Sequence, residues 1–164
     1  MALDPITRQA WTELVDVYQH VIPQVVARLE DDAGVDSGVF SILGHLVRAE
    51  HEAATSSAPA HLRLGELHAR MRVRYSQPGL SRAVQRMEAD GLVARHNDST
   101  DGRATVLVIT RKGRAFHRRA SAMYEDALAE YFGAWVDSAT GAALHRALGP
   151  IAARMTERDT PSPV

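Results

Sequence analysis

The apolar positions along the chain are spaced as in helices over most of its length. In residues 7–33 they recur every three or four positions, which predicts an amphipathic helix. The apolar residues concerned are Trp11, Leu14, Tyr18, Ile22, Val25 and Leu29. Pro23 lies inside this pattern and has no N–H to donate, so we expect a kink or a break near residues 19–22.

The central part of the chain alternates helical patterns with turn residues. A second helix is predicted over residues 37–50, with Asp36 or Ser37 as its N-cap. The polar and small residues at 50–60 predict a loop, and residues 64–71 predict a short helix.

A further helical pattern runs from Gln77 to about Asp90. Ser76 is suited to cap it, and Pro78 falls in the first turn, where its missing N–H costs nothing. Gly91 provides a natural end, because glycine readily adopts the left-handed backbone that follows many helices. The inward face is expected to carry Leu80, Ala83, Val84 and Met87.

Beyond this helix the pattern changes to that of strands. Residues 92–96 form a short extended run, and residues 105–109 are rich in β-branched side chains. Turn-forming residues at 97–102 separate the two runs. We therefore predict a β-hairpin there, as the only β structure in the chain.

The remainder of the chain returns to helical patterns. A long helix is predicted from the cap Thr110 to about Phe132. A last helix is predicted to begin at the cap Ser138 and to kink at Gly149–Pro150. Residues 159–164 are expected to be a disordered tail.

The order of helix, turn, helix and hairpin is typical of a winged helix-turn-helix. The predicted fold class is therefore mainly α with a small β-wing, with this unit placed between N- and C-terminal helices. The second helix of such a unit enters the major groove of DNA, and the hairpin beside it can reach the adjacent minor groove.

The distribution of charge selects the same part of the chain. The formal net charge is only −1, but residues 61–119 hold 13 Lys+Arg against 5 Asp+Glu, a net charge of +8. The other residues hold 6 Lys+Arg against 15 Asp+Glu, a net charge of −9. A basic block in an otherwise acidic chain is typical of phosphate binding, although a solvated basic face would have the same composition. All but one of the 13 are Arg, whose planar guanidinium suits phosphate and base edges.

Composition narrows the classes of function. A length of 164 residues suits one domain, and the absence of Cys excludes disulfides, thiolate zinc sites and thiol redox sensors. The first residues lack the features of a signal peptide, and no apolar run is long enough to cross a membrane. We therefore expect a cytoplasmic protein with no membrane partner.

Metal binding and catalysis find no support in the residue pattern. Four histidines lie within 24 residues, but none makes the i, i+4 pair of a helical zinc site. They are His45, His51, His61 and His68. We interpret them as surface or packing residues and expect no metal and no cofactor. The chain also has no Gly-rich phosphate loop and no nucleophile–base pattern, so no enzyme activity is expected.

Five short motifs carry a resemblance to a known family. They are Leu62–Leu67, Ser76–Arg82, Arg86–Val93, Asp98–Arg103 and Ile109–Gly113. In this order and spacing they resemble the MarR family of bacterial winged helix-turn-helix transcriptional regulators. The resemblance extends over nearly the whole chain, from Trp11 to Met155.

The resemblance implies an obligate homodimer built from a single MarR-like domain over residues 1–158. Residues 1–36 and 114–158 would form the dimerisation helices, and residues 37–113 the winged unit that binds DNA. Long helices with apolar faces at both ends of the chain fit this expectation. A two-fold dimer is expected to bind a pseudo-palindromic, double-stranded DNA operator with half-sites about 10 bp apart.

The expected DNA contacts lie on the helix that begins at Gln77 and on the hairpin. On the helix the candidates are Ser76, Gln77, Ser81, Arg82 and Arg86. Gln can pair with adenine edges, and Arg can pair with guanine or phosphate. The alternative is a helix face that is merely solvated.

The hairpin carries a motif of its own. Asp101 and Arg103 resemble the family's Asp-x-Arg wing motif, which implies that Arg103 enters the minor groove and that Asp101 orients it. A narrow minor groove attracts an inserted Arg. Arg95 on the opposite strand is expected to partner Asp101 or a phosphate. The alternative is a simple tight turn with a solvated Arg103.

A small-molecule effector is expected where the dimerisation helices of the family meet the winged unit. Trp11, Tyr18, Phe40 and His45 are the candidates for such a cleft, and their chemistry suits an aromatic or carboxylate ligand. The alternative places Trp11, Tyr18 and Phe40 in the core of the monomer or of the dimer. The function hypothesis is thus a ligand-responsive regulator that acts as a repressor. The rival hypothesis is a winged helix that binds protein without recognising an operator.

Overall fold

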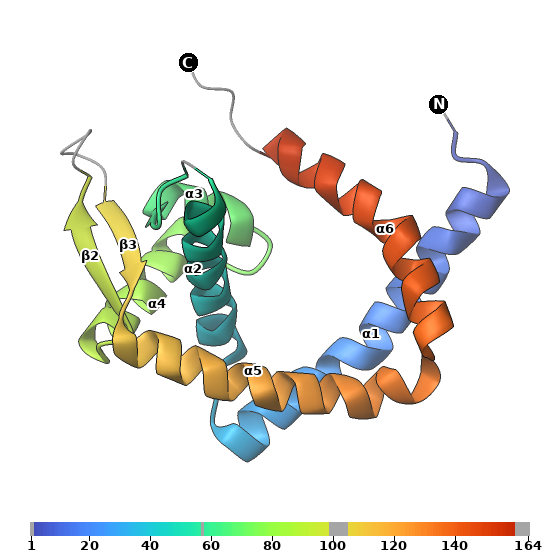
Figure 1. Cartoon of the computed structure of the whole chain (residues 1–164), viewed down its shortest axis with the longest axis horizontal. Coiled ribbons are helices and arrows are strands. Elements are labelled where there is room, and N and C mark those ends of the chain that lie inside the picture. Colours follow the sequence, from blue (N-terminus) through green and yellow to red (C-terminus); the bar gives the residue numbers. More distant parts are fainter. Residues whose placement is uncertain (1, 57, 99–104, 160–164) are drawn as a thin grey trace. The chain divides into compact units, whose positions relative to one another are not determined.

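Helices make up most of the chain, as the apolar spacing predicts (Figure 1). The structure is a computed structural model that describes residues 2–56, 58–98 and 105–159, without the side chains of residues 32–33 and 156–159. It divides into two compact units. We call residues 29–124 the winged unit, and residues 1–28 together with 125–164 the terminal unit.

The elements follow the predicted order. The helices are α1 (Pro5–Ala33), α2 (Ser37–Thr55), α3 (Leu64–Met71), α4 (Gln77–Ala89), α5 (Arg111–Tyr131) and α6 (Ser138–Asp159), with a short 3₁₀ helix, η1 (Gly133–Trp135). The strands are β1 (Leu62–Arg63), β2 (Val93–Asn97) and β3 (Thr105–Ile109). Helix α1 continues through Pro23, so of the kink or break expected there the break is not present.

Helix α2 differs from its prediction at the C-terminal end. Its N-cap is Asp36, whose Oδ1 accepts a hydrogen bond from the Val39 N–H at 2.9 Å. The helix continues to Thr55, so the loop predicted over 50–60 was wrong in its first half. Glu, His and Ala in that stretch are compatible with a helix even though they are polar or small, and no Gly or Pro interrupts them.

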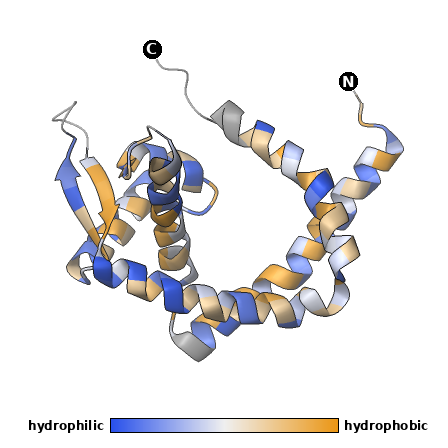
Figure 2. Ribbon diagram, viewed as in Figure 1, coloured by the Kyte–Doolittle hydropathy of each residue, from blue (hydrophilic) through white to orange (hydrophobic). Residues whose placement is uncertain are grey.

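The sheet contains one strand more than the sequence pattern indicates. The strand order is β1-β3-β2, and both pairings are antiparallel. Leu107 at the centre of β3 lies opposite Leu62 of β1 and Arg95 of β2. Strand β1 has only two residues, so its pairing with β3 leaves no periodic signal in the sequence. Figure 2 shows β3 as more hydrophobic than β2.

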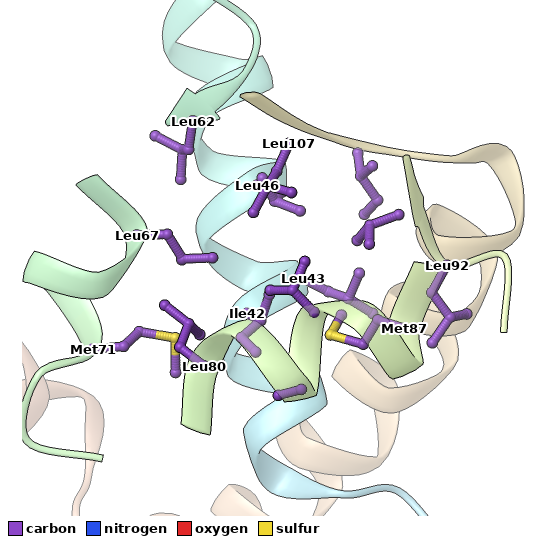
Figure 3. Packing of buried hydrophobic residues seen from close by; sticks show 14 of the residues in the cluster. Ile42, Leu43, Leu46, Leu62, Leu67, Met71, Leu80, Met87, Leu92 and Leu107 are labelled. Atoms are coloured by element: carbon purple, nitrogen blue, oxygen red, sulfur yellow. The ribbon is translucent and has the colours of Figure 1, made fainter. Parts of the chain in front are cut away.

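The core of the winged unit is built from α2, α3, α4 and the sheet (Figure 3). Leu43, Leu67 and Leu107 are completely buried and come from three different elements. The inward face of α4 is the predicted one, with Leu80, Ala83, Val84 and Met87 buried. Because one side of α4 is fixed in this core, its opposite side faces away from it.

Both ends of α4 are stabilised by the signals that the sequence predicts. Ser76 is the N-cap, and its Oγ accepts a hydrogen bond from the Gly79 N–H at 3.3 Å. Gly91 has a φ of 70°, which is the left-handed backbone expected after the helix.

The junction from β3 into α5 is packed against the end of α4. Thr110 caps α5, because its Oγ1 accepts from the Gly113 N–H at 3.0 Å. A Cβ at Gly113 would lie 2.1 Å from the Leu92 carbonyl oxygen, so only glycine allows this close approach.

The terminal unit leaves large apolar side chains in contact with solvent. They are Leu3, Ile6, Trp11, Leu14, Val17, Tyr18, Trp135, Leu144, Leu148, Ile151 and Met155. Helix α6 is capped by Asp137, whose Oδ1 accepts from the Thr140 N–H at 2.7 Å, and not by Ser138 as predicted. A search of the described helices found none with the length and apolar character needed to span a membrane.

Candidate nucleic-acid interface

The outward face of α4 presents polar and basic side chains. Gln77, Arg82 and Arg86 are exposed and Ser81 is half-buried, as expected for positions opposite the buried stripe. Gln85 is also exposed on this face. Neither Arg82 nor Arg86 has a hydrogen-bond or ion-pair partner among the described residues, so both guanidinium groups are available to an external anion.

A shallow groove of about 570 Å³ follows this face. Its lining residues are Tyr75, Gly79, Arg82, Gln85, Arg86 and Ala89. Two guanidinium groups and an amide therefore border one hollow, beside the small residues Gly79 and Ala89. Such a combination allows close approach of a phosphate or a base edge.

The turn before α4 is held by a polar chain that sequence reasoning missed. Arg74 Nη2 donates to Ser37 Oγ, and Ser37 Oγ donates to Glu30 Oε1 at 2.8 Å. Ser37 is one of the few buried polar residues described. These contacts connect the last turn of α1, the start of α2 and the turn that precedes α4. Arg74 is therefore occupied within the protein, although its sequence position suggests a free cation.

Tyr75 completes this support at the N-terminal end of α4. A Cβ at Gly38 would lie 1.9 Å from the Tyr75 hydroxyl oxygen, so a larger residue there would displace the ring from its place on α2. Burial and the nearby Asp36 carboxylate raise the pKa of Tyr75. The hydroxyl therefore remains neutral and can donate a hydrogen bond at the edge of the groove.

The end of β2 next to the hairpin loop is held by a partly buried ion pair. The Arg63 guanidinium contacts Asp98 Oδ2 through Nε and Nη2, both at 2.7 Å. The Asp98 side chain is 6% exposed, whereas the Arg63 side chain is 44% exposed. The sequence indicates only a turn former at Asp98, because its partner lies 35 residues away. Asp101 and Arg103, the predicted wing residues, lie outside the described residues.

Arg95 is turned toward α4. Its Nη2 donates to the Ser81 carbonyl at 3.2 Å, and its Nε lies 3.3 Å from Glu88 Oε2. Lys112 similarly donates to the Asp90 carbonyl at 2.6 Å, next to the C-terminal end of the same helix. Both cations lie in the basic block, and both are engaged by the protein itself.

One comparison relates the winged unit to a known family. The model described as the MarR family matches residues 33–104 of the sequence. This part of the winged unit is similar to the MarR family. A comparison with curated protein sequences found no match.

Crystal structures of transcriptional regulators, among them AbsC of the MarR family, share the fold of nearly the whole chain. AbsC from Streptomyces coelicolor is 23% identical, with a TM-score of 0.69, and the match covers 96% of this chain and 99% of AbsC. BldR from Sulfolobus solfataricus is 24% identical, also with a TM-score of 0.69, over 93% of this chain and 99% of BldR. The predicted fold class is thereby confirmed as a mainly helical, winged MarR fold.

One similar structure was solved with DNA. Sco3205 from S. coelicolor, a MarR family transcriptional regulator in complex with DNA, is 22% identical with a TM-score of 0.67. The match covers 99% of this chain and 92% of Sco3205.

The four predicted effector residues are divided between the two units. Trp11 and Tyr18 are exposed on the α1 segment of the terminal unit. Phe40 and His45 are partly buried on α2, in the winged unit. The expectation of one cleft formed by all four stays a prediction.

Phe40 belongs to an aromatic cluster that the sequence pattern did not reveal. Its ring stacks on His117 of α5, with centroids 5.1 Å apart, and its centroid lies 5.5 Å from that of Tyr124. Burial lowers the pKa of His117. His45 is nearby in sequence, and burial and the Arg70 and Arg48 charges lower its pKa as well. Both imidazoles therefore favour the neutral form in the folded protein.

The structure was also searched for metal ligands. In the part of the chain that it describes, no three His, Cys, Asp or Glu side chains come together as a metal site.

Proposed function

We propose that this chain is a DNA-binding transcriptional regulator that acts as a homodimer on a pseudo-palindromic operator. The observation that carries the proposal is the exposed face of α4. Arg82 and Arg86 border a groove on that face, while the opposite face is locked into the core. Free guanidinium groups on a rigid helix suit recognition of phosphate and base edges. The complex of Sco3205 with DNA supports the same use of the fold.

The exposed apolar side chains of the terminal unit support the homodimer. Helices α1 and α6 both carry such residues, among them Trp11 and Ile151. A contiguous apolar surface on a soluble protein usually marks an interface. A second copy would supply the same surface, and the two-fold symmetry would place two recognition helices on two half-sites.

The test measures binding to the DNA upstream of the chain's own coding sequence. Fluorescence anisotropy would compare this fragment with a scrambled duplex of equal length and composition, at several salt concentrations. We expect the upstream fragment to bind more tightly at physiological salt. Equal binding of both duplexes would overturn the proposal and favour a winged helix that binds protein instead.

Substitutions locate the interface within the same experiment. Arg86→Gln should weaken binding and reduce the slope of log K against log salt by about 1, because one phosphate contact is lost. Arg146→Gln, on the exposed part of α6, makes the same change of charge outside the proposed interface. It should leave the slope unchanged. Arg103→Ala tests the wing and should weaken operator binding while the dimer stays intact.

We further propose that a small aromatic or carboxylate effector releases the DNA, which makes the regulator a repressor. The support is the cluster of Phe40, His117 and Tyr124, which offers stacking surface and neutral ring nitrogens in one place. Benzoate is a suitable probe because it combines both chemical features. It should weaken operator binding by the wild type and have less effect on His117→Ala. Operator binding that increases with benzoate would contradict the repressor proposal.

A further inference from the structure

One arginine of the wing is joined to two turns of the recognition helix. Arg95 lies on β2, and its guanidinium contacts the Ser81 carbonyl and the Glu88 carboxylate of α4. Ser81 and Glu88 are seven residues apart, so they lie on the same side of the helix, two turns from each other. A single planar guanidinium thus contacts two residues whose backbone positions lie about 10 Å apart along the helix axis.

The position of Arg95 is itself fixed by the core. Its backbone lies opposite Leu107 of β3, and the Leu107 side chain is completely buried. The Arg95 side chain is only 26% exposed. The guanidinium therefore forms a defined link between the sheet and the outer side of α4, rather than a mobile surface charge.

The electrostatics of this link differ from those of a phosphate ligand. The Glu88 carboxylate lies 3.3 Å from Arg95 Nε and balances its charge. A neutralised cation releases no counterion when DNA binds, so it adds nothing to the salt dependence. Arg82 and Arg86, in contrast, have no such counter-charge among the described contacts.

We infer that Arg95 is a positioning residue that sets the angle between the wing and α4, and that Glu88 holds it in that role. The inference rests on the proposed DNA-binding function. The recognition helix and the wing must meet adjacent grooves of the same duplex at once. A small rotation of the hairpin about its base would displace its far end from the minor groove. Arg95 thus acts on specificity through geometry, without touching DNA.

The first experiment separates positioning from phosphate binding. Operator and scrambled duplexes would be titrated with the wild type, Arg95→Gln and Glu88→Gln over a range of salt concentrations. We expect Arg95→Gln to weaken operator binding about tenfold, which corresponds to about 1.4 kcal/mol. Binding to the scrambled duplex and the salt slope should stay as in the wild type. Arg86→Gln is the matched control and should reduce the slope by about 1.

Two further variants test whether the three groups act as a unit. The double variant Arg95→Gln/Glu88→Gln should bind the operator no more weakly than Arg95→Gln alone, because the link is already broken. Arg95→Lys should not restore affinity, since a single ammonium group lacks the planar fork that contacts two turns. A salt slope that falls by about 1 in Arg95→Gln, or full rescue by Arg95→Lys, would overturn the inference.

A measurement on the protein without DNA tests this inference separately from the proposed function. The chain has no Cys, so Gln85→Cys on α4 and His96→Cys on β2 can be spin-labelled selectively. We expect the distribution of distances between the two labels to widen when Arg95→Gln is added. An unchanged distribution would contradict the positioning role even if the operator is bound. Failure of the wild type to distinguish the two duplexes would count against the proposed function alone.

Discussion

The winged unit and the terminal unit bury their apolar side chains to very different degrees. In the winged unit, a cluster of 15 buried residues joins three helices and the sheet. Among its described residues, Val73 is the single large apolar side chain that is exposed. The terminal unit has the opposite character, because 11 large apolar side chains are exposed there. The first unit closes its core within one chain, whereas the second has an apolar surface that a second copy can cover.

The two units also differ in charge. The winged unit contains 14 Lys+Arg and 11 Asp+Glu, whereas the terminal unit contains 5 and 9. The net charges are therefore +3 and −4. Electrostatics would attract DNA to the winged unit and repel it from the terminal unit. This difference supports the proposal that one region binds DNA and the other binds a second copy of the chain.

The largest effect on association and operator affinity is expected from charged substitutions in the apolar surface of the terminal unit. Leu148→Asp together with Ile151→Asp places two charges on α6, where the side chains are 38% and 44% exposed. We expect the proposed dimer to dissociate into 17.9-kDa chains. Operator affinity should fall about 10²–10⁴-fold, because the two half-sites would no longer be bound together. Sedimentation and anisotropy measure the two effects.

Val73→Asp is the matched control for this change. Val73 is 98% exposed, but it lies in the winged unit. The same substitution there should leave the mass of the particle unchanged. Dissociation by Val73→Asp, or an intact dimer with the two α6 substitutions, would contradict the division of roles between the units.

The second largest effect concerns the core of the winged unit. Leu43→Ala removes a completely buried side chain and should lower the free energy of unfolding by about 2–5 kcal/mol. The loss should not depend on protein concentration if this core closes within one chain. Leu144→Ala, on the exposed face of α6, should lower the free energy of unfolding by an amount that grows as the protein is diluted. Chemical unfolding at two protein concentrations distinguishes the two behaviours.

Local signals predicted much of the fold. The bounds of α3 and β3 agree with prediction, and α4 is delimited by its cap Ser76 and by Gly91. These elements combine a clear periodicity with strong end signals. Strand β1 was missed because its existence depends on pairing with a strand more than 40 residues away. The first half of the 50–60 loop was misassigned because polar residues are not by themselves helix breakers.

Only the part of the site that follows from helical periodicity could be predicted from the sequence. Periodicity alone places Arg82 and Arg86 on the outer face of α4. It does not reveal which arginines are engaged elsewhere, because the partners of Arg63, Arg74 and Arg95 are distant in sequence. The net charge of the basic block therefore overstates the number of cations that are available to DNA.

The third prediction compares one ion pair from each unit. Asp98→Ala leaves the Arg63 guanidinium without its partly buried carboxylate and should cost about 1–3 kcal/mol of stability. The cost stays in this range because Arg63 remains half-exposed to water. Glu130→Gln breaks the Arg28–Glu130 pair of the terminal unit, in which both side chains are about half-exposed. It should cost less than about 1 kcal/mol. Equal losses of stability, measured by thermal unfolding, would show that the difference in burial does not change how much each ion pair contributes.

The smallest effect is a pH dependence that belongs to the winged unit. Burial lowers the pKa of His117, so the unfolded chain binds this proton more readily than the folded chain does. The folded state should therefore lose stability as the pH falls below about 6.5, the ordinary His value, and toward the lower pKa of the folded state. His117→Gln should flatten this part of the profile, because no proton is then taken up at that position. His145→Gln, an exposed position of the terminal unit, should retain the profile of the wild type. Thermal unfolding from pH 5 to 8 measures these profiles. A wild-type stability that rises as the pH falls would contradict the expected sign. A profile that is flattened by His145→Gln would assign the effect to the terminal unit.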